Sequence, residues 1–221
     1  MSNDAAWLRP AMGLSTPQID EVLGNRLFVK DAPKVLKPAA VLMLFSGTSL
    51  DDGEVVLTHR SPSMRSHSGQ IAFPGGRLEE GETPVDAALR EAWEETGLEA
   101  DTTTVVEELD PVTIRVSGHP VSPVLAHWHA PMHLWPASPA ETDDVFTASL
   151  RELLDPENRL TIGWGDWTGP AFWANGYLIW GFTGGLLSSL FAHAGWEEDW
   201  DRENRHDLRS VLRSSRNREK M

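Results

Sequence analysis

Hydrophobic residues along the chain follow two spacings, each typical of one kind of element. Residues 39–45 are continuously apolar, as expected for a strand that is buried on both faces. Residues 54–60 follow a polar turn and predict the second strand of a hairpin. Pro123 interrupts a later strand-like segment, which predicts an edge strand or a bulge there. The same pattern predicts further strands at residues 70–73, 102–109, 112–116, 121–128 and 177–180.

Apolar residues at intervals of three and four positions predict helices. The clearest helix covers residues 84–96, with Thr83 suited to the N-cap, Pro84 to the first helical position and Gly97 to the position after the C-cap. Its apolar stripe consists of Val85, Ala88, Leu89 and Ala92. Shorter helices are predicted at residues 17–27, at residues 183–193, and around Leu208, Val211 and Leu212, with a frayed tail after Arg213.

A long uncharged stretch lies between Asp166 and Glu197 and has the length of a membrane span. Its glycine, serine, threonine and asparagine residues divide it into the predicted strand and helix, so we expect no membrane segment. The chain also lacks an internal repeat. We therefore expect one domain over residues 1–221, with an N-terminal helical extension over about 1–35 and a C-terminal helix and tail over about 201–221.

Three glutamates, Glu91, Glu94 and Glu95, recur at intervals of three and four and so lie on one helix face. Like charges at this spacing repel one another by roughly 0.2–0.5 kcal/mol per pair. A hard divalent cation removes the repulsion, and Mg²⁺ usually binds through carboxylates together with substrate phosphates. The spacing therefore favours a metal and a phosphate-bearing substrate. The alternative is a solvated acidic helix face without a ligand.

Composition narrows the range of possible cofactors and partners. The chain has no cysteine, so any metal is held by oxygen or imidazole, which favours Mg²⁺ or Mn²⁺, and a cytoplasmic location is expected. A net charge of −14 argues against nonspecific nucleic-acid binding, which requires a basic surface. A small polyphosphate needs only a local positive cluster, for which the sequence offers Arg60, Arg65, Arg77 and Arg115.

The glutamates belong to a longer pattern that resembles the Nudix box, the signature of hydrolases that split a nucleoside diphosphate linked to another group. The pattern reads Gly76-x5-Glu82-x7-Arg90-Glu91-x2-Glu94-Glu95-x-Gly97-Leu98. One position departs from the family, because Ala92 stands where a larger aliphatic residue is preferred. The resemblance implies the Nudix fold, an α/β (α+β) architecture in which a mixed β-sheet lies between α-helices.

The residues before this pattern are similar to the extra motif of the coenzyme A diphosphatase branch of the family. They comprise Leu57-Thr58-x-Arg60-Ser61, Arg65, Gly69 and Phe73-Pro74-Gly75-Gly76, with His67 and Gln70 nearby. This resemblance implies cleavage of coenzyme A or acyl-coenzyme A into 3′,5′-ADP and (acyl-)4′-phosphopantetheine. The alternatives are a Nudix hydrolase of ADP-ribose or NADH, and a nucleotide sensor without turnover. The expected partner is a small coenzyme A-type nucleotide, with a homodimer left open.

The resemblance also assigns roles to individual residues. Glu91, Glu94 and Glu95 are the expected metal ligands, with Glu82 as an outer or additional ligand. The general base is a glutamate, and Glu94, Glu95 and Glu141 all stay open as candidates, while Arg90 is expected to orient a glutamate through a fork-shaped ion pair. His67 either orients a phosphate or bonds to a backbone carbonyl. The expected substrate-binding residues are Arg60, Arg65, His67, Gly75, Gly76 and Arg77.

Overall fold

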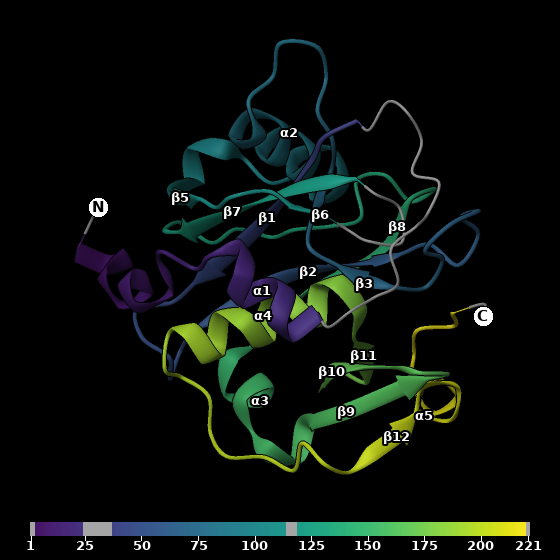
Figure 1. Ribbon diagram of the computed structural model, residues 1–221. Helices are drawn as coiled ribbons and strands as arrows, with labels where there is room; N and C mark the ends of the chain where they lie inside the picture. The colour runs from purple at the N-terminus through teal and green to yellow at the C-terminus, as the bar shows by residue number, and fades with distance from the viewer. Residues whose placement is uncertain (1–2, 24–36, 114–118, 220–221) are drawn as a thin grey trace.

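The computed structural model describes residues 3–23, 37–113 and 119–219 of the chain (Figure 1). The centre of its larger sheet is β1 (Ala39–Ser46), which pairs antiparallel with β2 (Glu54–Arg60) and parallel with β7 (Pro120–Trp128). The sheet is therefore mixed, and the predicted hairpin of β1 and β2 is confirmed. Its other strands are β3 (Ile71–Ala72), β4 (Gly75–Arg77), β5 (Thr103–Glu108), β6 (Val112–Thr113) and β8 (Thr142–Ser149).

Helices cover both faces of this sheet, as the resemblance implied. In Figure 1, α2 (Pro84–Thr96) lies above the sheet and α4 (Gly181–His193) lies below it. Residues of β1 alternate between the two sides, because successive side chains of a strand point in opposite directions. Ala40, Leu42 and Leu44 pack with α2, whereas Met43 and Phe45 join the cluster that contains α4. Burial on both faces explains why the β1 sequence is continuously apolar.

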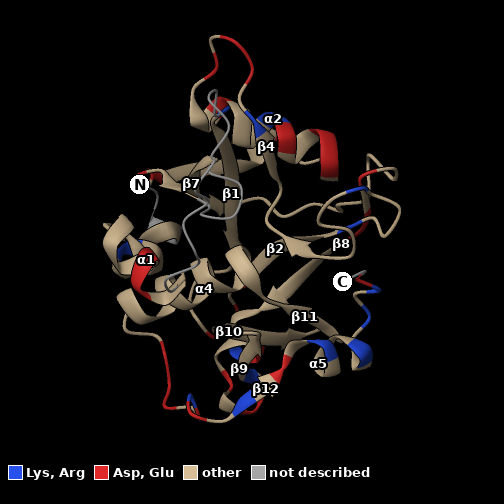
Figure 2. Ribbon diagram, turned by 45° about the vertical axis from the view of Figure 1, so that its right-hand side comes forward, with Lys and Arg blue, Asp and Glu red and all other residues tan. Residues whose placement is uncertain are grey.

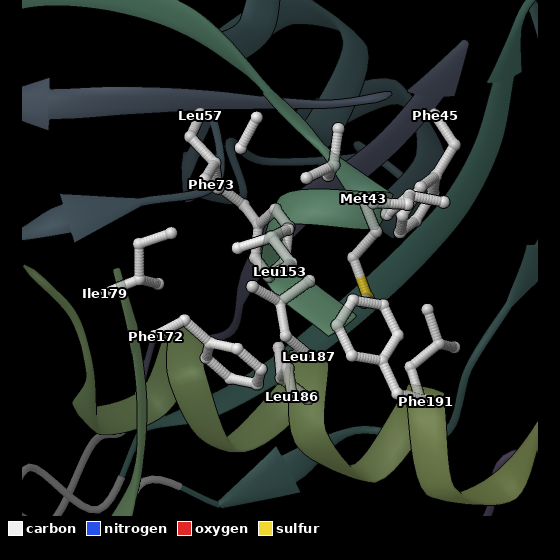
Figure 3. Close-up of a cluster of buried hydrophobic side chains, with 14 of the residues drawn as sticks. Met43, Phe45, Leu57, Phe73, Leu153, Phe172, Ile179, Leu186, Leu187 and Phe191 are labelled. Atoms are coloured by element: carbon white, nitrogen blue, oxygen red, sulfur yellow. The ribbon is translucent and has the colours of Figure 1, made fainter. Parts of the chain in front are cut away.

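A hydrophobic cluster under the larger sheet packs this sheet against helix α4 and a second, smaller sheet (Figure 3). It brings side chains of β1 and β2 against α4, and it includes residues of the smaller sheet. The labelled residues are Met43, Phe45, Leu57, Phe73, Leu153, Phe172, Ile179, Leu186, Leu187 and Phe191. Because helix α4 is apolar and almost entirely buried between the sheets, its uncharged sequence reflects a core helix. In the described ranges, no helix combines the length and apolarity that crossing a membrane requires.

The bounds of α2 agree with the prediction because the signals that start and stop it are local. Thr83 caps the helix in a reciprocal capping box with Asp86, and Pro84 occupies the first position. Gly97 ends the helix in the left-handed region at φ 72°, and its N–H donates to the carbonyl of Trp93. The predicted apolar stripe faces the sheet.

Gly97→Ala is expected to destabilise the protein more than Gly81→Ala, a matched control. Both glycines have positive φ, so both substitutions carry a backbone cost of about 1–2 kcal/mol. A Cβ at Gly97 would also lie 2.6 Å from the Trp135 ring, whereas a Cβ at Gly81 meets nothing within 4 Å. Displacing the ring adds about 1 kcal/mol. Denaturant unfolding of both variants measures the difference, and equal midpoints would contradict it.

The smaller sheet was largely missed from the sequence. It is ordered β11-β10-β9-β12, and only β11 (Tyr177–Ile179) was predicted. Pro170 within β10 and the mixed polarity of β9 obscured the strand pattern, although Gly165-Asp166 between them offered a hairpin signal. The missed strands are β9 (Arg159–Trp164), β10 (Trp167–Ala174) and β12 (Arg205–Asp207).

The remaining helices are short. The prediction at 17–27 corresponds to α1 (Thr16–Leu23), whose last predicted residues lie outside the described ranges, as do residues 114–116 of the predicted strand 112–116. The sequence did not predict the first of the 3₁₀-helices. The other helical segments are η1 (Asn3–Ala11), η2 (Ala100–Thr102), α3 (Leu150–Leu154), η3 (Pro156–Asn158) and α5 (Leu208–Ser214).

Two predictions need correction. The segment with Pro123 was expected to be an edge strand or to contain a bulge. It is not an edge strand, because β7 lies between β1 and β5 in the sheet, but its pairing with β5 is irregular between Val105 and Glu107. The carbonyl of Pro123 accepts from the N–H of Leu109, just beyond the end of β5. The N–H that proline lacks would face the same side of the strand, where the pairing with β5 has already ended. The chain after Arg213 is also not a frayed tail. Asn217 is fully buried and hydrogen-bonded to the backbone of β11.

Candidate active site

The acidic face of α2 lies against β4, which carries the two glycines of the sequence pattern. Glu95 is only 3% exposed, and the Gly75 N–H donates to its Oε2 at 3.2 Å. A Cβ at Gly76 would lie 2.3 Å from Glu91 Oε1, so only glycine lets the strand approach that carboxylate so closely. Both residues belong to β4, which pairs with β1. In this structure the two glycines position the glutamates.

Arg90 is the main cation on this face. Its Nε and Nη2 donate to the two oxygens of Glu82 at 2.7 and 3.1 Å, which is the fork-shaped pair expected from the sequence. Its Nη1 lies 3.0 Å from Glu91 Oε1 and 3.2 Å from Glu94 Oε2. The hydrogen bonds with Glu82 raise the pKa of Arg90 and lower that of Glu82. Arg90 therefore offsets part of the repulsion along α2.

Glu95 lies beyond the reach of that arginine in a more buried position. Its pKa is raised to about 7, chiefly by burial and to a smaller extent by the charges of Glu91 and Glu141, while Arg60 and the Gly75 N–H oppose the shift. The pKa of Glu91 is also raised, chiefly by burial. Figure 2 shows the acidic residues of α2 in red above β8. This combination of burial and mutual repulsion is typical of carboxylates in a functional site.

Two candidates from distant parts of the sequence meet beside these carboxylates. Arg60 ends β2, and its Nη1 lies 4.0 Å from Glu95 Oε1. The Ser61 N–H donates to the Glu141 carbonyl at 2.7 Å, which ties the loop after β2 to the start of β8. Glu141 is exposed and close enough for its charge to act on Glu91 and Glu95. The fold therefore brings Arg60, Glu141 and the α2 glutamates together.

The other predicted substrate-binding side chains are exposed. Arg65 and His67 lie on the loop after β2, and Arg77 ends β4. His67 has a left-handed backbone, with φ 55°, and its Nδ1 is 2.9 Å from the side-chain oxygen of Gln70. Its partner is thus a side chain, in place of the backbone carbonyl weighed from the sequence. The Nε of Arg60 is buried and has no hydrogen-bond partner in the described ranges. An incoming acceptor such as a phosphate oxygen would satisfy it.

The fit of a divalent cation can be tested on the donor set. Glu91 and Glu95 could supply oxygen ligands, and the repulsion between them and from Glu141 is what a hard cation would remove. The geometry of a metal site is not formed, however. Across residues 3–23, 37–113 and 119–219, no group of three or more His, Cys, Asp or Glu side chains is arranged to hold a metal ion. The chemistry of the residues therefore fits Mg²⁺ or Mn²⁺. Glu82, Glu91 and Glu94 converge on Arg90 in this structure, and their role as metal ligands together with Glu95 stays a prediction.

Comparison with known proteins decides the family. A family model described as the NUDIX domain matches residues 36–163, more than half of the chain, and this range includes β4, α2 and Glu141. The chain belongs to the Nudix family. It is accordingly an enzyme of the Nudix hydrolase type, and the predicted fold class is confirmed.

Two named relatives are similar to this Nudix chain over most of its length. It is 35% identical over 155 residues to "Uncharacterized Nudix hydrolase NudL" of Klebsiella pneumoniae, covering 64% of this chain and 75% of that protein. It is 34% identical over 172 residues to "Nudix hydrolase 15, mitochondrial" of Arabidopsis thaliana, covering 71% of this chain and 58% of that protein. A solved Nudix hydrolase from M. smegmatis, RenU, is 29% identical with a TM-score of 0.42, covering 50% of this Nudix chain and 69% of that one.

Sequence reasoning missed a set of polar residues next to Arg60. His59 was assigned only to a strand, yet it is fully buried with its Nδ1 against Asp143 and its Nε2 2.8 Å from the carbonyl of Asn217. Gln70 was noted near the motif without a role. A histidine inside an apolar strand was a weak signal for a buried polar contact. Its partners lie far away in sequence, so spacing could not reveal them.

Proposed function

We propose that this Nudix hydrolase cleaves the diphosphate linkage of coenzyme A or its acyl esters, giving 3′,5′-ADP and (acyl-)4′-phosphopantetheine. Family membership supports the coarser activity, the hydrolysis of a nucleoside diphosphate derivative. One observation supports the finer assignment. Arg60, from the motif that resembles the coenzyme A branch, lies 4.0 Å from Glu95, and its buried Nε has no hydrogen-bond partner among the described residues. The loop that carries Arg65 and His67 begins directly after it.

The residues divide the work according to their surroundings. Glu91 and Glu95, with Glu94 beside them, would hold Mg²⁺ or Mn²⁺, because burial makes their charge unfavourable without a cation. When bound, such a metal neutralises the diphosphate and lowers the pKa of a coordinated water. Arg60 binds a phosphate oxygen. Arg90 orients Glu91 and Glu94 while its fork holds Glu82, which we place outside the ligand set.

The proton acceptor in this proposal is Glu141. Glu94 is paired with Arg90, and Glu95 is buried where a cation would lie, so both are otherwise occupied. Glu141 is exposed on the β8 side and close to both Glu91 and Glu95. From there its carboxylate can take the proton of a water that attacks phosphorus in line with the leaving oxygen.

Purified protein with Mg²⁺ or Mn²⁺ is expected to release 3′,5′-ADP from coenzyme A and acetyl-coenzyme A, and a chelator is expected to abolish the release. The physical reason is that the diphosphate charge must be neutralised before water can attack. Mass analysis of phosphate-containing products, with NADH and ADP-ribose in parallel, measures this. Cleavage of NADH or ADP-ribose alone would overturn the coenzyme A assignment and leave the hydrolase. Binding of a nucleotide without any turnover would favour a sensor.

A further inference from the structure

Residues 215–219, here called the docking segment, are held against the smaller sheet by one buried side chain. The Leu178 N–H donates to Asn217 Oδ1 at 2.8 Å, and Asn217 Nδ2 donates to the Leu178 carbonyl at 2.9 Å. The amide thus pairs with β11 as a neighbouring strand would. Asn217 has no exposed surface, so its two hydrogen bonds fix the segment in one place.

The backbone of the docking segment touches the chain at both ends of the substrate loop, residues 61–68. Before the loop, His59 Nε2 lies 2.8 Å from the Asn217 carbonyl. After the loop, a Cβ at Gly69 would lie 2.4 Å from the same carbonyl and 2.8 Å from Glu219 Cα. Gly69 is therefore a contact surface for the segment. Both ends of the substrate loop are set by one piece of chain.

A chain of side chains continues from the docking segment into the loop itself. Trp180 Nε1 donates to Glu219 Oε2 at 2.9 Å, and Gln70 Nε2 donates to Glu219 Oε1 at 2.7 Å. The other end of the Gln70 amide, Oε1, lies 2.9 Å from His67 Nδ1. Glu219 thus fixes the orientation of the Gln70 amide, because both of its oxygens accept from a donor. That orientation in turn presents an acceptor to His67.

The segment also reaches the strand that follows Glu141. Arg218 Nη2 donates to Asp143 Oδ2 at 2.7 Å, and Asp143 Oδ1 bonds to the buried His59. Asp143 lies two residues beyond Glu141 at the start of β8. The docking segment therefore contacts both ends of the substrate loop and the start of β8.

We propose that the docking segment is a positioning element for the substrate loop, acting through Glu219, Gln70 and His67 to set where the loop meets the nucleotide. This deepens the proposed function, on which it rests. The positioned groups bind the substrate equally in the ground state and in the transition state. Loosening them therefore raises KM and leaves kcat nearly unchanged.

A reciprocal exchange tests the central contact. Gln70→Glu places two carboxylates face to face, and Glu219→Gln leaves one of the donors, Gln70 or Trp180, without an acceptor. Each single variant is expected to raise KM about 10-fold with kcat within about twofold. In the double variant the glutamine introduced at position 219 donates to the carboxylate introduced at position 70 and still accepts from Trp180, while that carboxylate also accepts from His67. The double variant is expected to return KM to within about threefold of wild type.

The control is Glu203→Gln. It removes the same charge as Glu219→Gln, at an exposed residue that precedes the docking segment, and should leave KM unchanged. Unchanged KM in both single variants would overturn the proposal, and so would a double variant no better than either single one. KM is measured on whichever nucleoside diphosphate derivative the wild type cleaves. The outcome for the docking segment is therefore independent of whether the substrate is coenzyme A. If no substrate turns over, amide hydrogen exchange of residues 61–69 decides: faster exchange in the singles and recovery in the double are expected.

Discussion

Glu95→Gln is expected to lower kcat at least 100-fold while the protein stays folded. Glu95 is the most buried carboxylate of the site, and among the described residues Arg60 and the Gly75 N–H offset its charge. In the proposed mechanism, replacing it removes an anionic ligand for the metal, whose neutralisation of the transferred phosphoryl group would be worth several kcal/mol, or about two or more powers of ten in rate. Glutamine keeps the size of the side chain and can still accept from Gly75.

Steady-state kinetics with saturating Mg²⁺ measures this loss. Glu80→Gln provides the matched control, because Glu80 is exposed in the loop between β4 and α2 and carries the same charge. We expect the control to keep full activity. Wild-type kcat in Glu95→Gln would remove Glu95 from the reaction, whatever its burial.

The second large effect concerns stability in the absence of metal. Burial raises the pKa of Glu95 from 4.5 to about 7, so between these values the folded protein holds a proton that the unfolded chain has released. The resulting contribution to the unfolding free energy is complete below pH 4.5 and is lost as pH rises through about 7. At most about 3 kcal/mol is involved, at 1.36 kcal/mol per unit of pKa shift.

Urea unfolding of chelator-treated protein at pH 5 and pH 8 measures this contribution. Glu95→Gln cannot lose a proton, so its stability relative to wild type should rise by about 2.5 kcal/mol between the two pH values, because part of the contribution is already lost at pH 5. Mg²⁺ at pH 8 should stabilise wild type, where the ionised carboxylate can bind it, more than the variant. The same pH dependence in both proteins would mean that another group carries it.

The sequence was most informative where structure depends on neighbouring residues. Helix α2 begins and ends as predicted because Thr83, Pro84 and Gly97 act within one turn of the helix. The acidic face followed from helical spacing alone, and β1 followed from its apolar run. These features need no knowledge of the rest of the chain, so a single sequence carries them.

The sequence was least informative where structure depends on distant partners. Pro123 lies in an inner strand because β5 ends opposite it, which the local pattern around Pro123 does not contain. Asn217 follows a charged, Arg-rich stretch typical of a tail, yet Leu178 gives its amide two buried partners. Likewise, the resemblance implied that Glu82 is an outer or additional ligand, but the sequence pattern does not show the Arg90 fork that engages both of its oxygens.

The parallel pairing of β1 with β7 has a kinetic consequence. Ala39 pairs with Val121, about 80 positions further along the chain, and the acidic helix lies within the intervening stretch. Closing so long a loop has a large entropic cost before any contact repays it, so a high contact order predicts slow folding. Helix α2 can form early from its own caps. Its carboxylates, however, meet Arg60 and Glu141 only once β2 and β8 have paired, which makes assembly of the catalytic centre a late event in folding.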